Sequence, residues 1–471
     1  MDRATYNNGR AAYNTGTAGR LRLTLHAKRG DKPLVSEPRR EGSPNSVRAV
    51  KGMNDVLPSE VGRWHRIEAA FRRAMEWLGY REVRTPYVEP TPLFVRAIGE
   101  TTDVVEKEMY SFSHHDEPLT LRPEGTAGIA RAYVEHKIYN EEPITRWYYL
   151  GPMFRAERPQ RGRYRQFSQL GAECFGDAGP GCDAEMIDSL VDFLRDIGIA
   201  SPEVFINSIG SGDTRARYKQ ALVAKFVPVK DKLSAESQRR LVTNPLRILD
   251  SKNPVDRELV QDAPKVLDFL SDEDRAHWDA LRRHLDALGT PYQIDTRLVR
   301  GLDYYGRTLF EIKGAYDKLG AGSTLIGGGR YDSMITELGG PQVPAIGFAA
   351  GIERLLIASE IQVPTSVVDV LVAPIGEEAF NAALVLGRDI RRVGIRCEVD
   401  TRKASIKALL RRANTLGARI ALIVGERELR DGVVEMKDLA EHMQERVARA
   451  DIVTRVATHV AMPFVAHKRA P

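Results

Sequence analysis

A dense group of arginines is the clearest sign of chemistry in this sequence. Five of them fall within eleven residues of the segment 151–171, which reads GPMFRAERPQRGRYRQFSQLG. Guanidinium groups make planar, bidentate contacts to phosphate or carboxylate that a lysine ammonium cannot make. Gln169 and Glu173 follow at alternate positions, so a strand would direct both toward one face, alongside the arginines. This spacing favours a binding surface over a solvated loop. The arginines are Arg155, Arg158, Arg161, Arg163 and Arg165.

The segments around these arginines predict the element that positions them. An apolar, aromatic run at 147–150 leads in, and an alternating run at 166–175 leads out. Two such runs joined by a link rich in proline, glycine and arginine are typical of a β-hairpin with a long tip. We therefore expect two antiparallel strands with a basic loop between them.

A second candidate position lies upstream, in the segment LTLRPEGT at 119–126. The pattern predicts a strand that ends in a Pro-Glu-Gly turn, followed by a helix that begins at Thr126. Glu124 at the start of such a helix can simply be a charge that the helix dipole favours. It can equally bind an ammonium group together with Thr126. The nearby hairpin favours the second interpretation.

Three further segments combine glycine with charged or aromatic residues. LVRGLDYY at 298–305 predicts a strand broken by Gly301, and GGGRYD follows at 327–332. GFAAGIERL at 347–355 predicts a strand that runs into a helix carrying Arg354. Because no GxxxxGK[ST] loop occurs, a nucleotide site here would consist of arginines on an antiparallel sheet.

Composition bounds the class of protein. The 471 residues are too many for one ordinary core, and 42% apolar with 28% charged residues is typical of a globular protein. A net charge of +5 is compatible with a nucleic-acid partner. Three cysteines without a CxxC pair suit a reducing compartment. We expect no membrane span and no metal-binding cluster.

The chain divides into parts of different character. Residues 1–46 predict a disordered extension, and a misplaced start codon is the rival explanation. A helix is expected at 59–78, starting at Ser59, and a strand at 80–86. Residues 213–277 are helical and charged, which fits an insertion that either contacts RNA or is simply solvated. After Pro364, alternating β and α patterns over 366–471 predict a small α/β domain with a largely parallel sheet.

A basic stripe marks that last domain. Lys403, Lys407 and Arg411 recur every four residues, with no acidic residue between Asp400 and Glu426. Such a stripe is usually a solvated face, but it can also bind RNA. The opposite, buried side of the helix is predicted to consist of Ile406, Leu409, Leu410 and Ala413.

Taken together, these motifs resemble the class II aminoacyl-tRNA synthetases, and in detail the histidyl-tRNA synthetase family. The resemblance extends from about Val47 to Leu439 and rests on KGMNDVLP, LRPEGT, GPMFRAERPQRGRYRQF, LVRGLDYY, GGGRYD and GFAAGIERL in the expected order. It implies an α+β catalytic domain over 47–365, with a mixed, mainly antiparallel sheet flanked by helices and a helical insertion. Residues 366–471 would be an anticodon-binding α/β domain.

The resemblance also implies roles for individual residues. Arg300 and Arg155 would act directly on the reacting groups. Histidine would contact Glu124, Thr126, Arg155, Gln169, Glu173, Arg300, Tyr304 and Tyr305. ATP would contact Arg155, Glu157, Arg163 and Arg354. Transfer RNA would contact Arg158, Gln160, Arg161, Lys403, Lys407 and Arg411.

The implied reaction is ATP-dependent ligation of L-histidine to tRNA(His) through a histidyl-adenylate. ATP would arrive with Mg²⁺, and the protein would be a cytoplasmic homodimer. The main alternative is a histidine-binding regulatory paralogue that does not charge tRNA. Ser168 departs from the family, which usually has His or an aromatic residue there.

Overall fold

The computed structural model describes residues 47–461, except residues 101, 301, 303, 315–323 and 364–365. The extension predicted at 1–46 lies outside the described residues. Two large sheets organise the described chain, one of eight strands and one of five. A smaller antiparallel sheet of three strands accompanies the eight-stranded one, and its strands are β2 (Val88–Pro90), β4 (Glu117–Leu121) and β3 (Tyr110–His114).

The eight-stranded sheet is mixed and mainly antiparallel, as the sequence predicted. Only the edge pairs β1–β5 and β7–β8 are parallel. In spatial order the strands are β1 (Arg81–Glu82), β5 (Thr145–Phe154), β6 (Gln166–Phe175), β11 (Ala345–Gly351), β10 (Thr324–Arg330), β9 (Gly306–Lys313), β7 (Glu203–Ser208) and β8 (Tyr292–Ile294). The predicted hairpin is confirmed as β5 and β6, which pair along their whole length.

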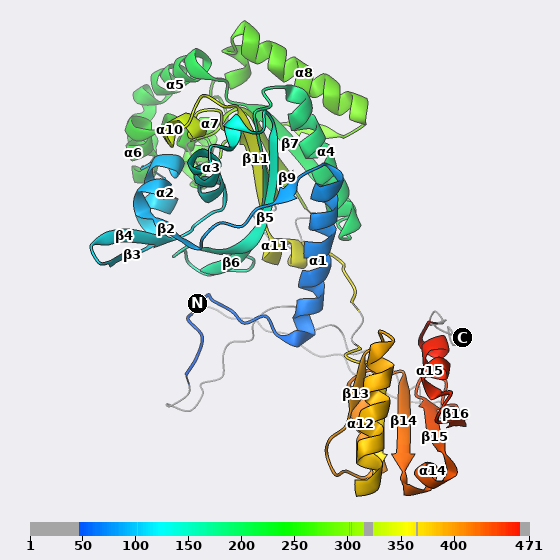
Figure 1. Ribbon diagram of the computed structural model, residues 1–471. Helices are drawn as coiled ribbons and strands as arrows, with labels where there is room; N and C mark the ends of the chain where they lie inside the picture. Colours follow the sequence, from blue (N-terminus) through cyan, green and yellow to red (C-terminus); the bar gives the residue numbers. More distant parts are fainter. Residues whose placement is uncertain are drawn as a thin grey trace, which may run out of the picture. The chain divides into compact units, whose positions relative to one another are not determined.

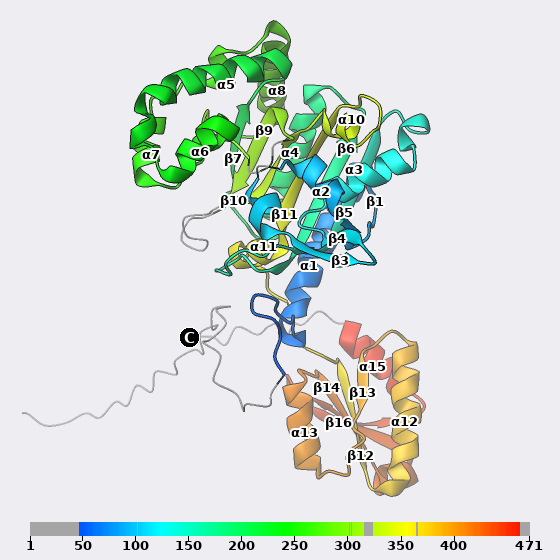
Figure 2. The same cartoon turned by 90° about the vertical axis from the view of Figure 1, so that its left-hand side faces the viewer.

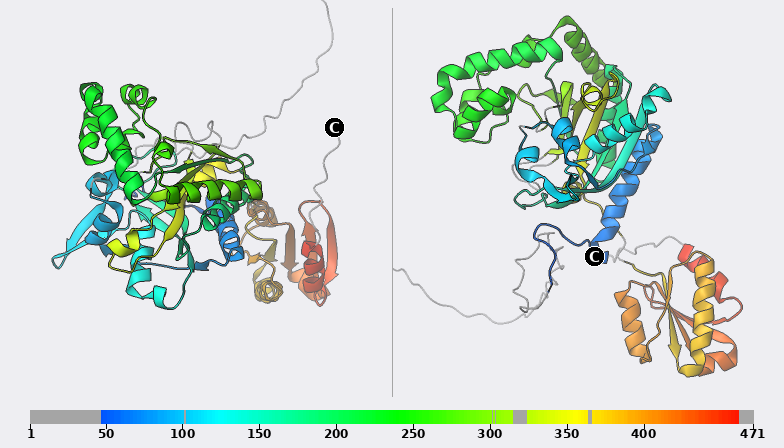
Figure 3. Two further views of the ribbon diagram at one scale, coloured as in Figure 1. Left: turned by 90° about the horizontal axis from the view of Figure 1, so that it is seen from above. Right: turned by 60° about the vertical axis from the view of Figure 1, so that its left-hand side comes forward.

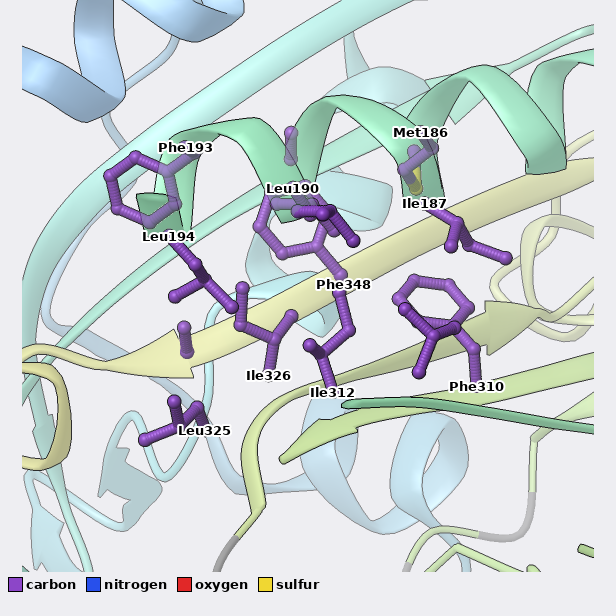
Figure 4. Packing of buried hydrophobic residues seen from close by; sticks show 14 of the residues in the cluster. Met186, Ile187, Leu190, Phe193, Leu194, Phe310, Ile312, Leu325, Ile326 and Phe348 are labelled. Atoms are coloured by element: carbon purple, nitrogen blue, oxygen red, sulfur yellow. The ribbon is translucent and has the colours of Figure 1, made fainter. Parts of the chain in front are cut away.

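Helices cover both faces of this sheet (Figure 1). One core forms beneath α1 (Pro58–Trp77), α4 (Pro180–Asp196), α8 (Asp272–Leu288) and α11 (Ile352–Ala358). A second core forms on the other face beneath α2 (Thr91–Ile98), α3 (Thr126–Glu135) and α10 (Met334–Glu337). Figure 4 shows the first core, where Leu190 and Leu194 of α4 point toward Phe348 and Ile326 of the strands.

Further helices follow β7 in the chain and precede β8, and they lie on the side of the large sheet where β7 is found (Figure 2). They have an apolar core of their own, in which Tyr218, Leu222 and Phe226 are fully buried. The elements before α8 are α5 (Gly212–Phe226), η3 (Val227–Lys232), α6 (Ala235–Thr243), η4 (Pro245–Ile248), α7 (Pro254–Val260) and η5 (Val266–Asp268). We call the segment 212–268 the insertion. It begins one residue before the predicted 213–277 and ends before α8, whose Trp278, Leu281 and Leu285 lie in the core of the large sheet. Two short helical segments lie elsewhere, η1 (Val104–Glu108) and η2 (Ile138–Asn140).

Some local predictions were wrong. Helix α1 starts one residue earlier than expected, with Pro58 in its first turn and no side-chain cap, because proline is well suited to that position. The strand expected at 80–86 is reduced to Arg81–Glu82. The described residues of 298–305 form no strand. The side chains of Leu298 and Tyr305 are instead buried in the core beneath α3, which holds this segment out of the sheet ladder.

The five-stranded sheet has helices on both faces (Figure 3). Its strands in order are β13 (Cys397–Val399), β12 (Val370–Ile375), β14 (Ile420–Gly425), β15 (Val433–Asp438) and β16 (Gln444–Ala448). Helices α12 (Glu377–Arg392), α14 (Glu426–Asp431) and α15 (Ile452–Ala461) share one core, and α13 (Ile406–Thr415) packs on the opposite face.

The largely parallel sheet predicted for this part is only half correct. The three strands β13, β12 and β14 are parallel, but β15 and β16 run antiparallel. Helix α14 is six residues long and ends at Gly432, which has a φ of +67°. A parallel crossover needs a dozen residues or more, so this short connection returns the chain antiparallel to β14. Within the described part of the chain, no helix is long and apolar enough to cross a membrane.

Candidate active site

The site lies where strand β6 faces the N-terminus of α3. Side chains on β6 alternate between the two faces of the sheet, as the pleat requires. Leu170, Ala172 and Cys174 lie in the core beneath α1 and α4. Gln169 and Glu173 therefore point to the opposite face, where α3 begins. Both are buried, at 7% and 0% exposure.

Glu124 caps helix α3. One carboxylate oxygen accepts a hydrogen bond from the Thr126 backbone N–H and the other accepts one from Ala127, each at 2.8 Å. Burial raises the pKa of Glu124, and these two N–H groups act in the opposite direction. Each oxygen retains a second lone pair. The helix-start interpretation is thus correct for Glu124, and it leaves the carboxylate able to accept a further bond from a cationic ligand.

Glu173 is held between two hydroxyl groups. Thr126 Oγ1 donates to Glu173 Oε1 at 2.7 Å, and the Tyr331 hydroxyl donates to Oε2. Burial raises the pKa of Glu173 well above its usual range, although both hydroxyl groups counteract this. Gly347 of β11 lies opposite Glu173, and a Cβ there would come within 1.6 Å of Glu173 Oε2. Only glycine leaves room for this carboxylate.

Buried tyrosines surround the two carboxylates. The rings of Tyr304 and Tyr305 lie 4.5 Å apart, and those of Tyr304 and Tyr331 lie 5.6 Å apart. Tyr149 of β5 extends its hydroxyl over the backbone of Gly171, where a Cβ would come within 2.5 Å of that hydroxyl. Four aromatic rings, each with a polar hydroxyl group, are therefore packed around the two carboxylates.

Arg155 and Gln169 both contact the Pro-Glu-Gly turn. Arg155 Nε donates to the carbonyl oxygen of Pro123 at 2.8 Å, and its guanidinium lies over the Phe167 ring. Gln169 Oε1 accepts a hydrogen bond from the backbone N–H of Gly125 at 3.2 Å. The turn that carries Glu124 is therefore held on both sides by the hairpin.

Arg300 and Arg354 are connected through the end of the sheet. Arg300 Nη1 forms an ion pair with Glu311 Oε1 at 2.6 Å. Glu311 Oε2 accepts a hydrogen bond from Thr324 Oγ1 at 2.9 Å, and the carbonyl oxygen of Thr324 accepts one from Arg354 Nε at 2.8 Å. The two arginines, 54 positions apart in the chain, thus share one small network.

The tip of the hairpin is tight and mostly exposed. Gln160 and Arg163 exchange backbone hydrogen bonds, and Arg163 Nη1 lies 3.3 Å from Glu157 Oε2. A Cβ on Gly162 would lie 3.3 Å from Cγ of Arg354, which brings the tip beside that arginine. The exposed side chains are those of Arg158, Gln160, Arg161 and Arg163. A cavity of about 600 Å³ beside the tip is lined by Lys107, Glu108, Ala156, Glu157, Arg158, Pro159 and Gln160.

The remaining predicted residues belong to the five-stranded sheet and its helices. Lys407 and Arg411 are exposed on α13, while Leu409 and Ala413 are buried beneath it. Lys403 precedes the helix and pairs with Glu377 at 2.7 Å. The three-residue stripe on one helix was therefore wrong, because α13 begins only at Ile406. Ile406 itself is 44% exposed and is not part of the buried side.

The arrangement suits two kinds of ligand at once. Two buried carboxylates, an amide and several tyrosines match a small cation with further hydrogen-bonding groups. The arginines match an anion with several charged oxygens. Among the described residues, no group of three or more His, Cys, Asp or Glu side chains could hold a metal ion.

Sequence reasoning missed three residues of this site. Tyr331 lies inside the GGGRYD motif, which by itself indicates no role for it, and Tyr149 lies in a run whose pattern indicates only an apolar strand. Glu311 lies eleven residues after Arg300 and carried no motif of its own. The alternation of β5 could have indicated Tyr149, because it lies directly opposite Gly171 on β6.

Two family models and several relatives match this chain. The models are described as histidyl-tRNA synthetase, over residues 52–355, and anticodon binding domain, over residues 369–459. A histidine–tRNA ligase of Sorangium cellulosum is 58% identical and covers 85% of this chain and 94% of that protein. One of Syntrophotalea carbinolica is 46% identical, with 86% and 96% covered. A crystal structure of apo S. aureus histidyl-tRNA synthetase has 34% identity and a TM-score of 0.75, and it covers 87% of this chain and all of that one.

Proposed function

The chain belongs to the histidyl-tRNA synthetase family, and we propose that the cluster around Glu124 and Glu173 binds histidine while the neighbouring arginines bind ATP. The protein is a histidine–tRNA ligase, which joins histidine to its tRNA with ATP as substrate. The single observation that carries the site assignment is the Thr126–Glu173–Tyr331 network, which fixes a buried carboxylate next to the start of α3.

Histidine carries hydrogen-bond donors that match the buried acceptor oxygens of this site. Its α-ammonium would donate to Glu124, Thr126 and Gln169, whose acceptor oxygens lie around the turn before α3. The positive charge of this ammonium group would also favour the ionised forms of Glu124 and Glu173, whose pKa values are raised by burial.

The imidazole needs one donor and one acceptor. Glu173 and Tyr305 would meet its two nitrogens, with Tyr304 packed alongside. An apolar amino acid of similar size would leave these buried polar groups without partners, which discriminates by about 10⁴-fold or more.

The first chemical step forms an adenylate. A carboxylate oxygen of histidine attacks the α-phosphorus of ATP, and the bond from this phosphorus to the bridging oxygen of diphosphate breaks. The carboxylate is already ionised, so no general base is needed. Arg155 would bridge the carboxylate and the α-phosphate, and Arg300 would stabilise negative charge that develops on the α-phosphoryl oxygens.

We place the other phosphates of ATP farther along the arginine network. Arg354 would bind the γ-phosphate, with Arg163 supporting the triphosphate from the hairpin tip. Glu157, which lines the cavity beside the tip, would contact the nucleotide. Mg²⁺ would enter with ATP. Magnesium ions that accompany nucleotides are held mainly by phosphates and water, with one or two carboxylates at most.

The second step transfers histidine from the adenylate to the terminal ribose of tRNA. We assign adenylation to residues 47–365 and anticodon binding to 366–471. The exposed Arg158, Gln160 and Arg161 would face the acceptor end. Lys407 and Arg411 would contact the anticodon arm, and Lys403 would do so only after leaving Glu377. The separate apolar cores of the two sheets support this division.

We also infer a homodimer in the cytoplasm. The helix and strand expected at 59–86, with the strand ending at Pro86, resemble the element through which class II synthetases form dimers, and this resemblance supports a dimer. Trp77, which is 79% exposed near the end of α1, supports it too. Three free, buried cysteines suit a reducing compartment. Sedimentation analysis of the wild type against Trp77→Glu tests the dimer, and a monomeric wild type would contradict it.

The experiment that tests the site is histidine-dependent exchange of diphosphate into ATP. Arg300→Ala is expected to lower exchange by about 10²–10³-fold, because a positive group at the reacting phosphorus is lost. Calorimetric binding of histidine should remain within a few-fold of the wild type. Unchanged exchange by Arg300→Ala would remove its proposed role. The regulatory paralogue is not favoured, since the relatives with high identity are ligases.

A further inference from the structure

Glu311 lies at the centre of the arginine network and has no role in the proposed reaction. It is the partner of Gly327 across the antiparallel pair β9–β10, so both positions face the same side of the sheet. Because Gly327 has no side chain, the space above it is available to another residue. The guanidinium of Arg300 occupies that space.

The fit at Gly327 is close. A Cβ on this residue would lie 2.2–2.3 Å from the guanidinium atoms of Arg300. Any larger residue would therefore displace the arginine. Glu311, directly across the strand pair, grips the same guanidinium through Nη1 at 2.6 Å. Two adjacent sheet positions thus fix the guanidinium of Arg300. Gly327 leaves room for it, and Glu311 supplies the negative charge that pairs with it.

The second oxygen of Glu311 has a different partner. Glu311 Oε2 accepts a hydrogen bond from Thr324 Oγ1. The carbonyl oxygen of Thr324 in turn accepts a hydrogen bond from Arg354 Nε. Lys313 lies 4.0 Å from the same carboxylate oxygen, and its ammonium also lies over the Phe205 ring. Glu311 consequently connects an arginine at one end of the expected triphosphate with an arginine at the other.

We propose that Glu311, with Gly327, is a positioning residue that orients Arg300 toward the α-phosphate and aligns it with Arg354. The proposal rests on the roles proposed above for these two arginines. Glu311 touches neither substrate. A carboxylate restricts the rotamers of the Arg300 side chain before ATP arrives, so less entropy is lost when the transition state forms. Its negative charge also offsets the repulsion between the assembled cations.

Steady-state exchange of diphosphate into ATP tests this proposal. Glu311→Gln keeps the size and one acceptor oxygen but removes the charge, and it is expected to lower kcat about 10- to 100-fold. The KM for histidine should change less than about threefold, since the contacts expected from Glu124, Gln169 and Glu173 do not involve Glu311. Gly327→Ala should lower kcat in the same way. Glu203→Gln, an exposed carboxylate on β7 of the same sheet, is the matched control and should behave as the wild type.

A double-mutant cycle separates positioning from other roles. If Glu311 acts through Arg300, Glu311→Gln added to Arg300→Ala should reduce exchange by less than about threefold further. Fully additive losses would overturn the proposal. Recovery of kcat in Glu311→Gln at raised Mg²⁺ would also overturn the proposal, because such a recovery would show that Glu311 is a metal ligand. Wild-type exchange in Glu311→Gln, together with impaired exchange in Arg300→Ala, would contradict this inference alone. Wild-type exchange in Arg300→Ala would contradict the proposed function.

Discussion

Arg215, on the first helix of the insertion, donates a hydrogen bond from Nη1 to the carbonyl oxygen of Tyr305 at 2.9 Å. The insertion therefore holds the backbone at one wall of the proposed histidine pocket. The neighbouring Arg307 strengthens this attachment, because its backbone N–H donates to Gly210 and its side chain pairs with Asp274 of α8. The proposed histidine pocket thus depends on Arg215 and Asp274, which belong to none of the sequence motifs.

This contact predicts that Arg215→Ala raises the KM for histidine about tenfold. Loss of one hydrogen bond from a charged donor costs about 1.5–3 kcal/mol, and part of that is lost from binding when Tyr305 shifts. Arg215→Lys should recover part of the loss. Lys225→Ala, at the exposed end of the same helix, is the control. An unchanged KM in Arg215→Ala, measured by diphosphate exchange, would show that Tyr305 is placed without this bond.

Thr126→Val is predicted to weaken histidine binding more sharply. Valine has almost the shape of threonine but cannot donate to Glu173 Oε1, so a buried acceptor loses its partner at a cost of about 1–3 kcal/mol. Calorimetry should give a Kd that is about 5- to 100-fold higher. The control is Thr415→Val at the exposed end of α13. Wild-type affinity in Thr126→Val would mean that Tyr331 alone orients Glu173.

The five-stranded part is predicted to serve tRNA and not adenylation. A chain that ends at Thr365 should retain diphosphate exchange but charge tRNA with a much higher KM. The double variant Lys407→Ala, Arg411→Ala should raise that KM with adenylation unchanged, because each lost phosphate contact weakens binding and its salt dependence. Arg455→Ala, on α15 over the opposite face, is the control for losing a cation elsewhere in this part. Equal charging kinetics in all of these proteins would refute the anticodon assignment.

His277 gives the protein an acid limit to its stability. Its side chain is 9% exposed, and burial, reinforced by Arg330 and Arg307, lowers its pKa to about 4. Asp332 and Asp274 act in the opposite direction, and Asp183 Oδ2 lies 3.6 Å from Nε2. The unfolded chain, with a histidine pKa of about 6.5, takes up this proton first. Stability is therefore retained above pH 6.5 and is lost as the pH falls toward 4.

The expected loss from His277 alone is about 1–2 kcal/mol by pH 5. Thermal unfolding of the wild type and His277→Gln at pH 7.5 and pH 5 measures it. The variant should be the less stable protein at pH 7.5, and the gap between the two melting temperatures should narrow at pH 5. A constant gap would mean that the imidazole titrates normally in the folded state.

Local spacing in the sequence determined much of this protein. The alternation at 166–175 predicted strand β6 and the shared face of Gln169 and Glu173, and the Pro-Glu-Gly turn predicted the start of α3. These features depend on backbone period and turn chemistry within about ten residues, which a single sequence displays directly. The glycines of the segment 347–355 likewise predicted that a strand runs into the helix that carries Arg354.

Tertiary structure decided which residues complete each cluster. Tyr331 reaches Glu173 across 158 positions. Glu311 meets Arg300 because the Arg300 guanidinium lies over Gly327, the cross-strand partner of Glu311. The segment 298–305 is not part of the sheet because its apolar side chains are buried in the core beneath α3. Strand β15 is antiparallel to β14 because α14, which connects them, is only six residues long. Such outcomes depend on which distant surfaces pack together, and no local period in the chain records that choice.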